Sequence, residues 1–145
     1  MSSKTTIAAP IKEQQRQWFR VDADGKILGK LATRIADTLR GKGKTIFALH
    51  TDLGDHVVVL NAEKVKVSGR KEEGKQYYSH SQYPGHLKIT PLKKMRAEKP
   101  WKILEEAVTG MLPKNKLRNR WMKRCHVYRG SEHPHKAAKF QDMLL

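Results

Sequence analysis

The stretch from Trp18 to Gly41, W-F-R-V-D-A-D-G-K-I-L-G-K-L-A-T-R-I-A-D-T-L-R-G, contains the signals of a strand, a turn and a helix in succession. Its opening W-F-R-V favours a short strand, and D-A-D-G favours a turn. Apolar residues then recur at positions i, i+3, i+4, i+7 and i+11, namely Leu28, Leu31, Ala32, Ile35 and Leu39. This spacing predicts a helix that turns one apolar stripe toward a core and stops at Gly41.

Five further segments have extended character. The compact apolar run His56–Asn61 predicts a central strand buried on both faces. Val65–Gly69 alternates apolar and polar residues, which predicts a strand with one exposed face. Tyr77–Tyr83 and His86–Leu92 are expected to be extended, and Val127–Tyr128 is expected to form a last short strand.

Helical signals return in the second half of the chain. Pro100–Gly110 carries an apolar stripe, and Pro100 suits the first turn of a helix. Shorter helices are expected at Lys93–Arg96 and around Leu117 and Trp121, whereas Arg70–Lys75 is expected to be a charged turn. We interpret Trp121 as an anchor to the folded body.

Composition points to an anionic partner. The 145 residues include 30 Lys and Arg against 14 Asp and Glu, so the net charge is +16 and the isoelectric point is about 10.1. Mean hydropathy is −0.71, and 38% of the residues are hydrophobic. So large an excess of positive charge repels itself unless a polyanion neutralises it. A lone Cys125 excludes an internal disulfide and favours a reducing compartment, and no membrane span or secretory signal is expected.

The basic residues are concentrated in one stretch, Gly110–Arg129. Between Met111 and Arg129 there is no Asp or Glu, and there are seven basic side chains: Lys114, Lys116, Arg118, Arg120, Lys123, Arg124 and Arg129. Apolar residues are interleaved with them. We therefore expect the segment to be held on a folded body with its cations outward, where they would meet a polyanion.

A second basic segment, Gly41–Thr45, has the letters G-K-G-K-T. A phosphate-binding loop of the G-x-x-x-x-G-K-[ST] type needs a glycine at the position of Thr38, and it follows a strand and opens a helix. Both conditions fail here. We interpret the segment as a helix stop and a basic loop in which Arg40, Lys42 and Lys44 contact RNA phosphates.

Three other patterns suggest chemistry, and simpler interpretations are favoured for two of them. Asp52 and Asp55 are expected in a turn with local hydrogen bonds rather than in a catalytic pair. The set Cys125, His126, His133 and His135 offers only one thiolate, so polar loop histidines beside RNA are favoured over zinc. The tyrosines of Tyr77–Tyr83 fit base stacking and a half-buried edge strand equally well.

Six stretches together resemble one family, the universal large-subunit ribosomal protein thirteen family in its bacterial form. They are W-F-R-V-D-A-D-G-K-I-L-G-K-L-A-T (18–33), L-R-G-K (39–42), G-D-H-V-V-V-L-N-A-E-K-V (54–65), Y-Y-S-H-S-Q-Y-P-G (77–85), A-V-T-G-M-L-P-K-N-K-L (107–117) and V-Y-R-G-S-E-H-P-H (127–135). They cover nearly all of residues 18–135, and the last two are the most specific.

The resemblance implies an α/β fold with a small, mostly parallel or mixed sheet of about four strands between helices, with basic loops and extended termini. Residues 1–17 are expected to be a flexible or RNA-ordered extension, residues 18–135 a single domain, and residues 136–145 a C-terminal tail.

The resemblance also implies a function, that of a structural constituent of the large ribosomal subunit in the cytoplasm. Its partners would be the large-subunit ribosomal RNA and neighbouring ribosomal proteins, and it would help early assembly by neutralising phosphates. No enzymatic activity, membrane or small-molecule substrate is expected, and no cofactor or metal site beyond Mg²⁺ bound to the RNA partner. The alternative is an architectural nucleic-acid-binding protein outside the ribosome. A free nucleic-acid enzyme is disfavoured because the acids are scattered.

The candidate RNA-binding residues are mostly cations, with a few polar and aromatic side chains. They are Arg40, Lys42, Lys44, Tyr78, His80, Lys93, Lys94, Lys114, Asn115, Lys116, Arg118, Arg120, Lys123, Arg124, His133 and His135.

Overall fold

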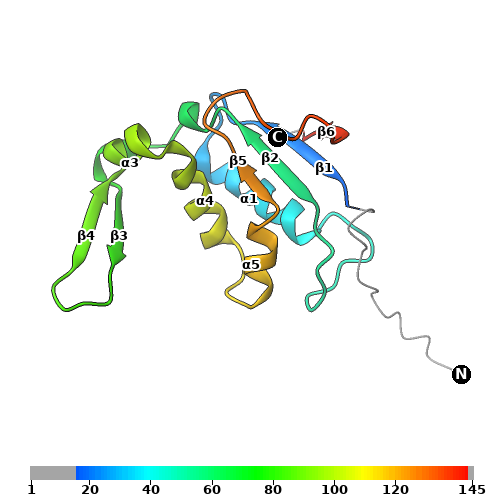
Figure 1. Cartoon of the computed structure of the whole chain (residues 1–145), viewed down its shortest axis with the longest axis horizontal. Coiled ribbons are helices and arrows are strands. Elements are labelled where there is room, and N and C mark those ends of the chain that lie inside the picture. Colours follow the sequence, from blue (N-terminus) through cyan, green and yellow to red (C-terminus); the bar gives the residue numbers. More distant parts are fainter. Residues whose placement is uncertain (1–15, 144–145) are drawn as a thin grey trace, which may run out of the picture.

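The computed structural model describes residues 16–143, so most of the expected N-terminal extension lies outside the described residues. The elements in chain order are β1 (Trp18–Asp22), α1 (Leu28–Arg40), β2 (His56–Leu60), the short 3₁₀ helix η2 (Ala62–Lys64), α2 (Lys71–Gly74), β3 (Gln76–His80), β4 (Leu87–Pro91), α3 (Leu92–Glu98), α4 (Pro100–Met111), α5 (Leu117–Met122), β5 (Cys125–Val127) and β6 (Phe140–Asp142). Figure 1 shows their arrangement.

A four-stranded parallel sheet forms the centre of the body, with the strand order β5-β2-β1-β6. β2 is an inner strand, and its residues Val57, Val58 and Val59 are fully buried. Helices flank this sheet, and β3 and β4 form a separate antiparallel pair (Figure 1). The expected α/β class with a small, mostly parallel sheet is confirmed.

The core lies between the sheet and the helices α1 and α4. Leu28, Leu31, Ala32, Ile35 and Leu39 are all buried, so the helix predicted from their spacing is confirmed. They join Val57 and Val59 of the sheet and Ile103, Leu104 and Val108 of α4 in one cluster. α1 ends at Gly41, which adopts the left-handed conformation (φ 78°) and donates its N–H to the Thr38 carbonyl.

The opposite face of the sheet is covered by a layer of aromatic and imidazole rings. Trp18 stacks on His56 with ring centroids 4.2 Å apart, and His126 lies 4.5 Å from His135. Phe140 meets Trp18 edge-on. Because His135 and Phe140 come from the segment after β5, that segment closes this side of the body.

Two extended segments differ from expectation. The prediction of a strand at Val65–Gly69 is wrong. Only Lys66 pairs there, in an isolated bridge with Ile27. Gly69 then has a positive φ, which changes the direction of the chain. The segment expected as the tail contributes β6, which pairs in parallel with β1. The charged turn at Arg70–Lys75 contains the single helical turn α2.

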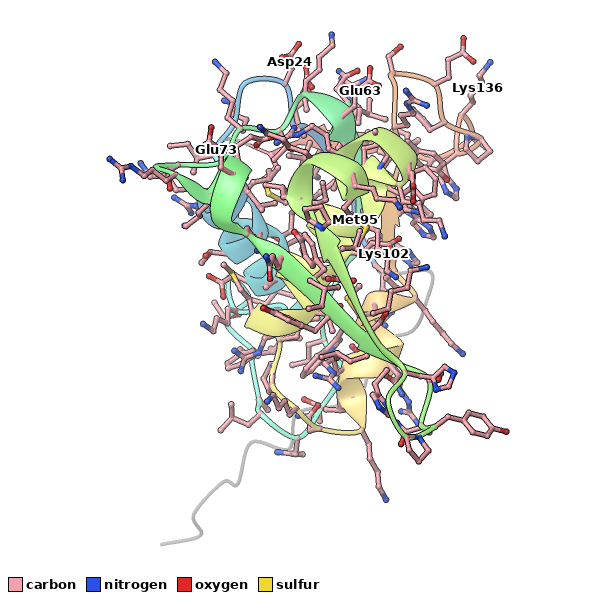
Figure 2. The ribbon with its side chains drawn as sticks, turned by 90° about the vertical axis from the view of Figure 1, so that its left-hand side faces the viewer. Asp24, Glu63, Glu73, Met95, Lys102 and Lys136 are labelled. Carbon is pink, nitrogen blue, oxygen red and sulfur yellow. The ribbon has the colours of Figure 1, made fainter. Side chains whose placement is uncertain are left out.

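The two extended segments of the middle region pair as a hairpin. β3 and β4 are antiparallel, with Tyr78 opposite Ile89 and His80 opposite Leu87. The hairpin stands beside the body in Figure 1, and Figure 2 looks onto it from that side. Lys93 and Lys94 follow on α3, where the predicted short helix is confirmed.

Asp52 joins three distant parts of the chain. Its carboxylate accepts hydrogen bonds from Trp121 Nε1 at 3.0 Å and from both terminal nitrogens of Arg124, one at 2.7 Å, and it pairs with Arg16 at 3.5 Å. Arg124 is only 7% exposed. We call Asp52, Arg16, Trp121 and Arg124 the Asp52 cluster. The expected local turn bonding is wrong here, because these partners lie far away in the sequence.

Asp55 has a similar long-range role. It is buried, and it accepts hydrogen bonds from the Gln17 N–H at 3.0 Å and from Lys44 Nζ at 2.6 Å. Lys44 also donates to the Leu53 carbonyl at 2.9 Å. The expected turn interpretation is therefore also wrong for Asp55. Residues 52–55 instead bind the loop after α1 to the start of β1.

Replacing Asp52 with Asn should destabilise the fold by about 3 kcal/mol, because the buried Arg124 loses its counter-charge. Urea denaturation measures the change. The matched control is Asp24→Asn, which removes the exposed pair with Lys64 and should cost less than about 1 kcal/mol. Equal losses in both variants would contradict the importance of the Asp52 cluster.

The stabilisation by Asp52 should also depend on pH. Burial alone would raise its pKa, but hydrogen bonding and charge from Arg124, aided by Arg16 and Trp121, hold the pKa below the ordinary 3.8. The stabilisation is therefore present above pH 3.8 and is lost as the pH falls through the lower folded-state pKa. Unfolding measured against pH should show wild type and Asp52→Asn converging in acid. A constant difference down to the acid limit would contradict this assignment.

Gly54 allows the chain to pass directly over the end of α1. A Cβ there would lie 1.6 Å from the Leu39 carbonyl oxygen, so Gly54→Ala must displace backbone. We expect a loss above about 3 kcal/mol in urea denaturation. In the same region, a Cβ on Gly43 would meet nothing within 4 Å, so Gly43→Ala should be close to neutral. Similar stabilities of the two variants would overturn the assignment.

Candidate nucleic-acid interface

The basic stretch is held on the body by two buried side chains. Leu112 and Trp121 are each 2% exposed, so the anchoring role predicted for Trp121 is confirmed. Between and beside them, Lys114, Lys116, Arg120 and Lys123 are exposed and Arg118 is half-buried. None of these five cations makes an ion pair with any residue in 16–143.

Asn115 fixes the turn that enters α5. Its side-chain oxygen accepts the N–H of Arg118 at 3.1 Å, and its own N–H donates to the Pro113 carbonyl at 2.9 Å. A side chain that accepts from the first turn of a helix defines where that helix begins. The cations before and after Asn115 are thus carried by an ordered turn.

Arg124 differs from the other predicted cations of this stretch. It is buried, and its guanidinium faces inward to Asp52. Its charge is matched within the body. Its predicted contact with RNA stays a prediction, but the geometry gives Arg124 a structural role.

The cations of the loop after α1 also differ in whether they are paired within the body or exposed. Lys44 is held by Asp55 and Leu53, as described above. Lys42 forms an exposed pair with Asp37 at 3.0 Å, and the guanidinium of Arg40 lies 5.6 Å from the Phe47 ring centre. Lys42 is exposed, whereas Arg40 and Lys44 are both half-buried, so Lys42 is the most accessible of the three cations.

The loop and α5 lie at the same end of the molecule (Figure 1). Asp52 bonds directly to Trp121 and Arg124 across this junction. The structure therefore brings together two candidate groups that are separated in sequence, Arg40–Lys44 and Lys114–Arg124.

The other candidates lie elsewhere. Tyr78 and His80 are exposed on the hairpin, away from α5 in Figure 1. The Tyr78 hydroxyl donates to Gln76 at 2.9 Å, and His80 Nδ1 accepts the Gln82 N–H at 2.9 Å. At the base of the hairpin, Lys93 and Lys94 are exposed, and Lys94 lies 3.7 Å from Glu98.

His133 and His135 belong to the ring layer over the sheet. The Tyr128 hydroxyl and His135 Nε2 are 2.9 Å apart. Burial, together with the charges of His135 and His56, lowers the pKa of His126, which favours its neutral form. These histidines are half-buried structural side chains as well as RNA-contact candidates.

The same region does not assemble the nominal zinc set. Within residues 16–143, no three His, Cys, Asp or Glu side chains gather in a way that could hold a metal ion. Cys125 is buried on the helix-packed side, and burial, with a contribution from Glu105, raises its pKa to about 12. The thiol is therefore protonated and acts as a core side chain.

In the described part of the chain, no helix is long and apolar enough to cross a bilayer.

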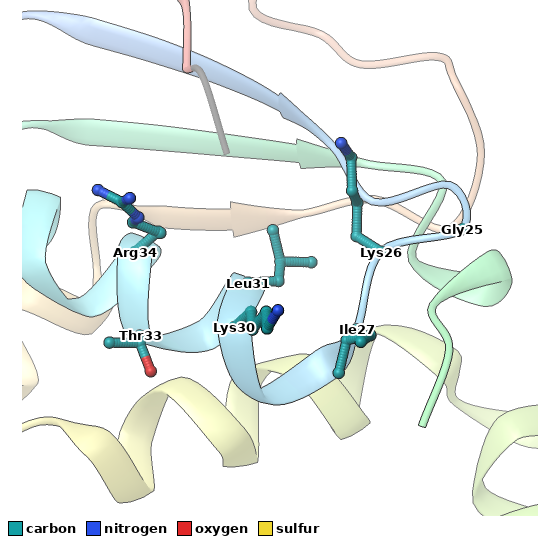
Figure 3. Close-up of a pocket in the computed structure, with 7 residues that line it drawn as sticks. All are labelled: Gly25, Lys26, Ile27, Lys30, Leu31, Thr33 and Arg34. Atoms are coloured by element: carbon teal, nitrogen blue, oxygen red, sulfur yellow. The ribbon is translucent and has the colours of Figure 1, made fainter. Parts of the chain in front are cut away.

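Several exposed cations were not among the sequence-based candidates. They lie around the first two turns of α1 and around the segment that leads into α2: Lys26, Lys30, Arg34, Arg70 and Lys71. Figure 3 shows Lys30 between Lys26 and Arg34 around one pocket. A signal was present, because Lys30 and Arg34 are like charges four residues apart on the polar face of the helix, an arrangement that is repulsive without an anion.

Comparison with known proteins agrees with the resemblance seen in the sequence. The family model for ribosomal protein L13 matches residues 16–134. The chain is 52% identical over 136 residues to the large ribosomal subunit protein uL13 of Geobacillus kaustophilus, with 94% of each chain covered. It is 49% identical over 138 residues to the uL13 protein of Psychrobacter arcticus, covering 95% of this chain and 97% of the relative. The chain therefore belongs to the ribosomal protein L13 family.

Proposed function

We propose that this chain is a structural constituent of the large ribosomal subunit, that it binds the large-subunit ribosomal RNA, and that it helps early assembly. Family membership supports the ribosomal role, since the relatives are named as large-subunit proteins. The observation that carries the RNA contact is the set of unpaired cations on the anchored turn and helix from Lys114 to Lys123.

The proposed mechanism is electrostatic, and it depends on the fixed conformation of the segment that carries the cations. Each phosphate neutralised by a Lys or Arg releases condensed counterions, which favours binding. Because Leu112, Trp121 and Asn115 hold the segment in place, its cations lose little freedom when they meet RNA. Neutralisation also lowers the repulsion between two RNA segments that lie against the same protein surface. Mg²⁺ bound to the RNA would contribute to the same neutralisation.

We infer that the protein acts without catalysis. Asp52 and Asp55, the two acids considered as a catalytic pair, both form ion pairs with buried or half-buried basic side chains. Other proteins of the large subunit would cover further surfaces, and the site of action would be the cytoplasmic ribosome.

Sedimentation tests the ribosomal assignment. In a lysate separated on a sucrose gradient at moderate salt, the tagged full-length protein should travel with large-subunit particles. The same gradient after nuclease treatment is the control, because digestion of the RNA should release the protein. A protein that stays with the soluble fraction in the untreated lysate would contradict the proposal and favour an architectural role elsewhere.

A charge-matched pair of variants tests the RNA surface. Replacing Lys114, Lys116, Arg118 and Arg120 with Ala should weaken binding to large-subunit RNA and reduce the salt slope by up to about 3 log units per log unit of salt. The control replaces four exposed lysines on other surfaces, Lys64, Lys102, Lys136 and Lys139, and keeps the same net charge. Circular dichroism checks folding. Equal effects of the two sets would contradict a specific contact at this segment.

A further inference from the structure

Two adjoining hollows lie beside the start of α1 and share Ile27. One, of about 620 Å³, is lined by the turn before α1 and its first two turns (Figure 3). The other, of about 820 Å³, lies between Gly29, the loop from Val67 to Lys75 and the end of α4 at Met111. We call the two hollows together the Ile27 groove. Volumes of this size are ordinary for ligand sites.

The groove is strongly cationic. Lys26, Lys30 and Arg34 line the first hollow, and Arg70, Lys71 and Lys75 line the second. No Asp or Glu lines either hollow. Elsewhere in residues 16–143 many cations are matched by acids, but none of these six makes an ion pair with a described residue. Lys75 lies over the Tyr77 ring, with its Nζ 5.1 Å from the ring centre, and the other five are exposed. Five exposed like charges around one groove favour an anion with several charges.

The floor of the groove is apolar and partly uncovered. Ile27 is 41% exposed and Met111 is 43% exposed. Glycine backbone is also open there: a Cβ on Gly29, Gly69 or Gly74 would meet nothing within 4 Å. An apolar floor beneath cations suits a ligand that carries both a flat apolar group and phosphates.

The groove also continues into the surface already assigned to RNA. The Thr33 hydroxyl lies 3.1 Å from the Met111 sulfur, so the second turn of α1 and the end of α4 are in direct contact. Lys114 follows Met111 after only Leu112 and Pro113. A strand that leaves the groove past Met111 reaches the cations of the turn before α5.

From this geometry we propose that the Ile27 groove binds unpaired nucleotides of RNA. The bases lie on Ile27 and Met111, and the phosphates lie against Lys30 and Arg34 on one side and Arg70 and Lys71 on the other. A paired helix hides its base faces, whereas an unpaired strand exposes them together with its phosphates. The inference rests on the proposed RNA-binding function and assigns it a second site with a distinct RNA structure.

Two variants separate the apolar and the charged parts of the site. Gly29→Leu places a side chain over the floor without changing charge, and it replaces glycine within α1 by a better helix former. The double variant Arg70→Ala with Lys71→Ala removes two cations. Its control, Lys136→Ala with Lys139→Ala, removes two exposed cations elsewhere; Figure 2 shows Lys136 and Glu73, at α2, on opposite sides of the molecule.

Binding of each full-length variant is measured to a single-stranded RNA oligonucleotide and to an RNA duplex of the same length. Gly29→Leu should bind the single strand about tenfold more weakly, with an unchanged salt slope and unchanged duplex binding. The Arg70 and Lys71 variant should reduce the single-strand slope by about 1.4, at about 0.7 for each phosphate contact, and reduce it more than the control does. Urea denaturation of each variant confirms the fold.

The outcomes that overturn the inference differ from those that overturn the proposed function. If the wild type binds neither RNA nor ribosomal particles, the proposed function fails. If the wild type binds RNA and Gly29→Leu binds the single strand equally well, only the groove is excluded. If the groove variants bind RNA normally but leave the large-subunit particles, a protein occupies the groove, which also overturns the inference.

Discussion

The architecture depends on one carboxylate, that of Asp52. It bonds to Arg124 between α5 and β5, to the Trp121 indole within α5, and to Arg16 ahead of β1. The loop after α1 and the basic helix are thereby joined through a partly buried ion pair and not only through apolar contact. Such a pair costs desolvation, so its value lies in fixing one arrangement rather than in large net stability. What it fixes is the orientation of the surface that carries Lys114 to Lys123.

The cations of the chain fall into two groups with different surroundings. Arg124, Lys44 and Arg96 are matched by Asp52, Asp55 and Glu72, and they connect elements of the body. Within residues 16–143, the other cations of the stretch from Lys114 to Lys123 and those of the Ile27 groove make no such ion pairs, and most of them are exposed. Sequence composition gives one net charge for both groups. The structure separates the charges that hold the fold from those that remain for a polyanion.

Local pattern predicted the elements that bury an apolar stripe. The α1 helix follows from the helical spacing of its apolar residues. The central strand β2 follows instead from a short continuous run of apolar, mostly β-branched residues, which is typical of a strand buried on both faces. Local sequence pattern does not predict long-range partners, and no nearby residue indicates that Asp52 pairs with Arg124. The F-Q-D of β6 is too short and polar to indicate a strand. Val65–Gly69 alternates correctly, but only Lys66 finds a partner backbone.

The parallel pairing of β6 with β1 has a consequence for synthesis. Asp142 meets Arg20 across a separation of 122 residues, so the outer edge of β1 stays bare until nearly all of the described chain has been made. An uncovered strand edge is where chains associate wrongly. During synthesis the chain thus exposes the unpaired backbone N–H and C=O groups of β1 and a large positive charge at the same time. Completion of β6 covers this edge and so ends that interval.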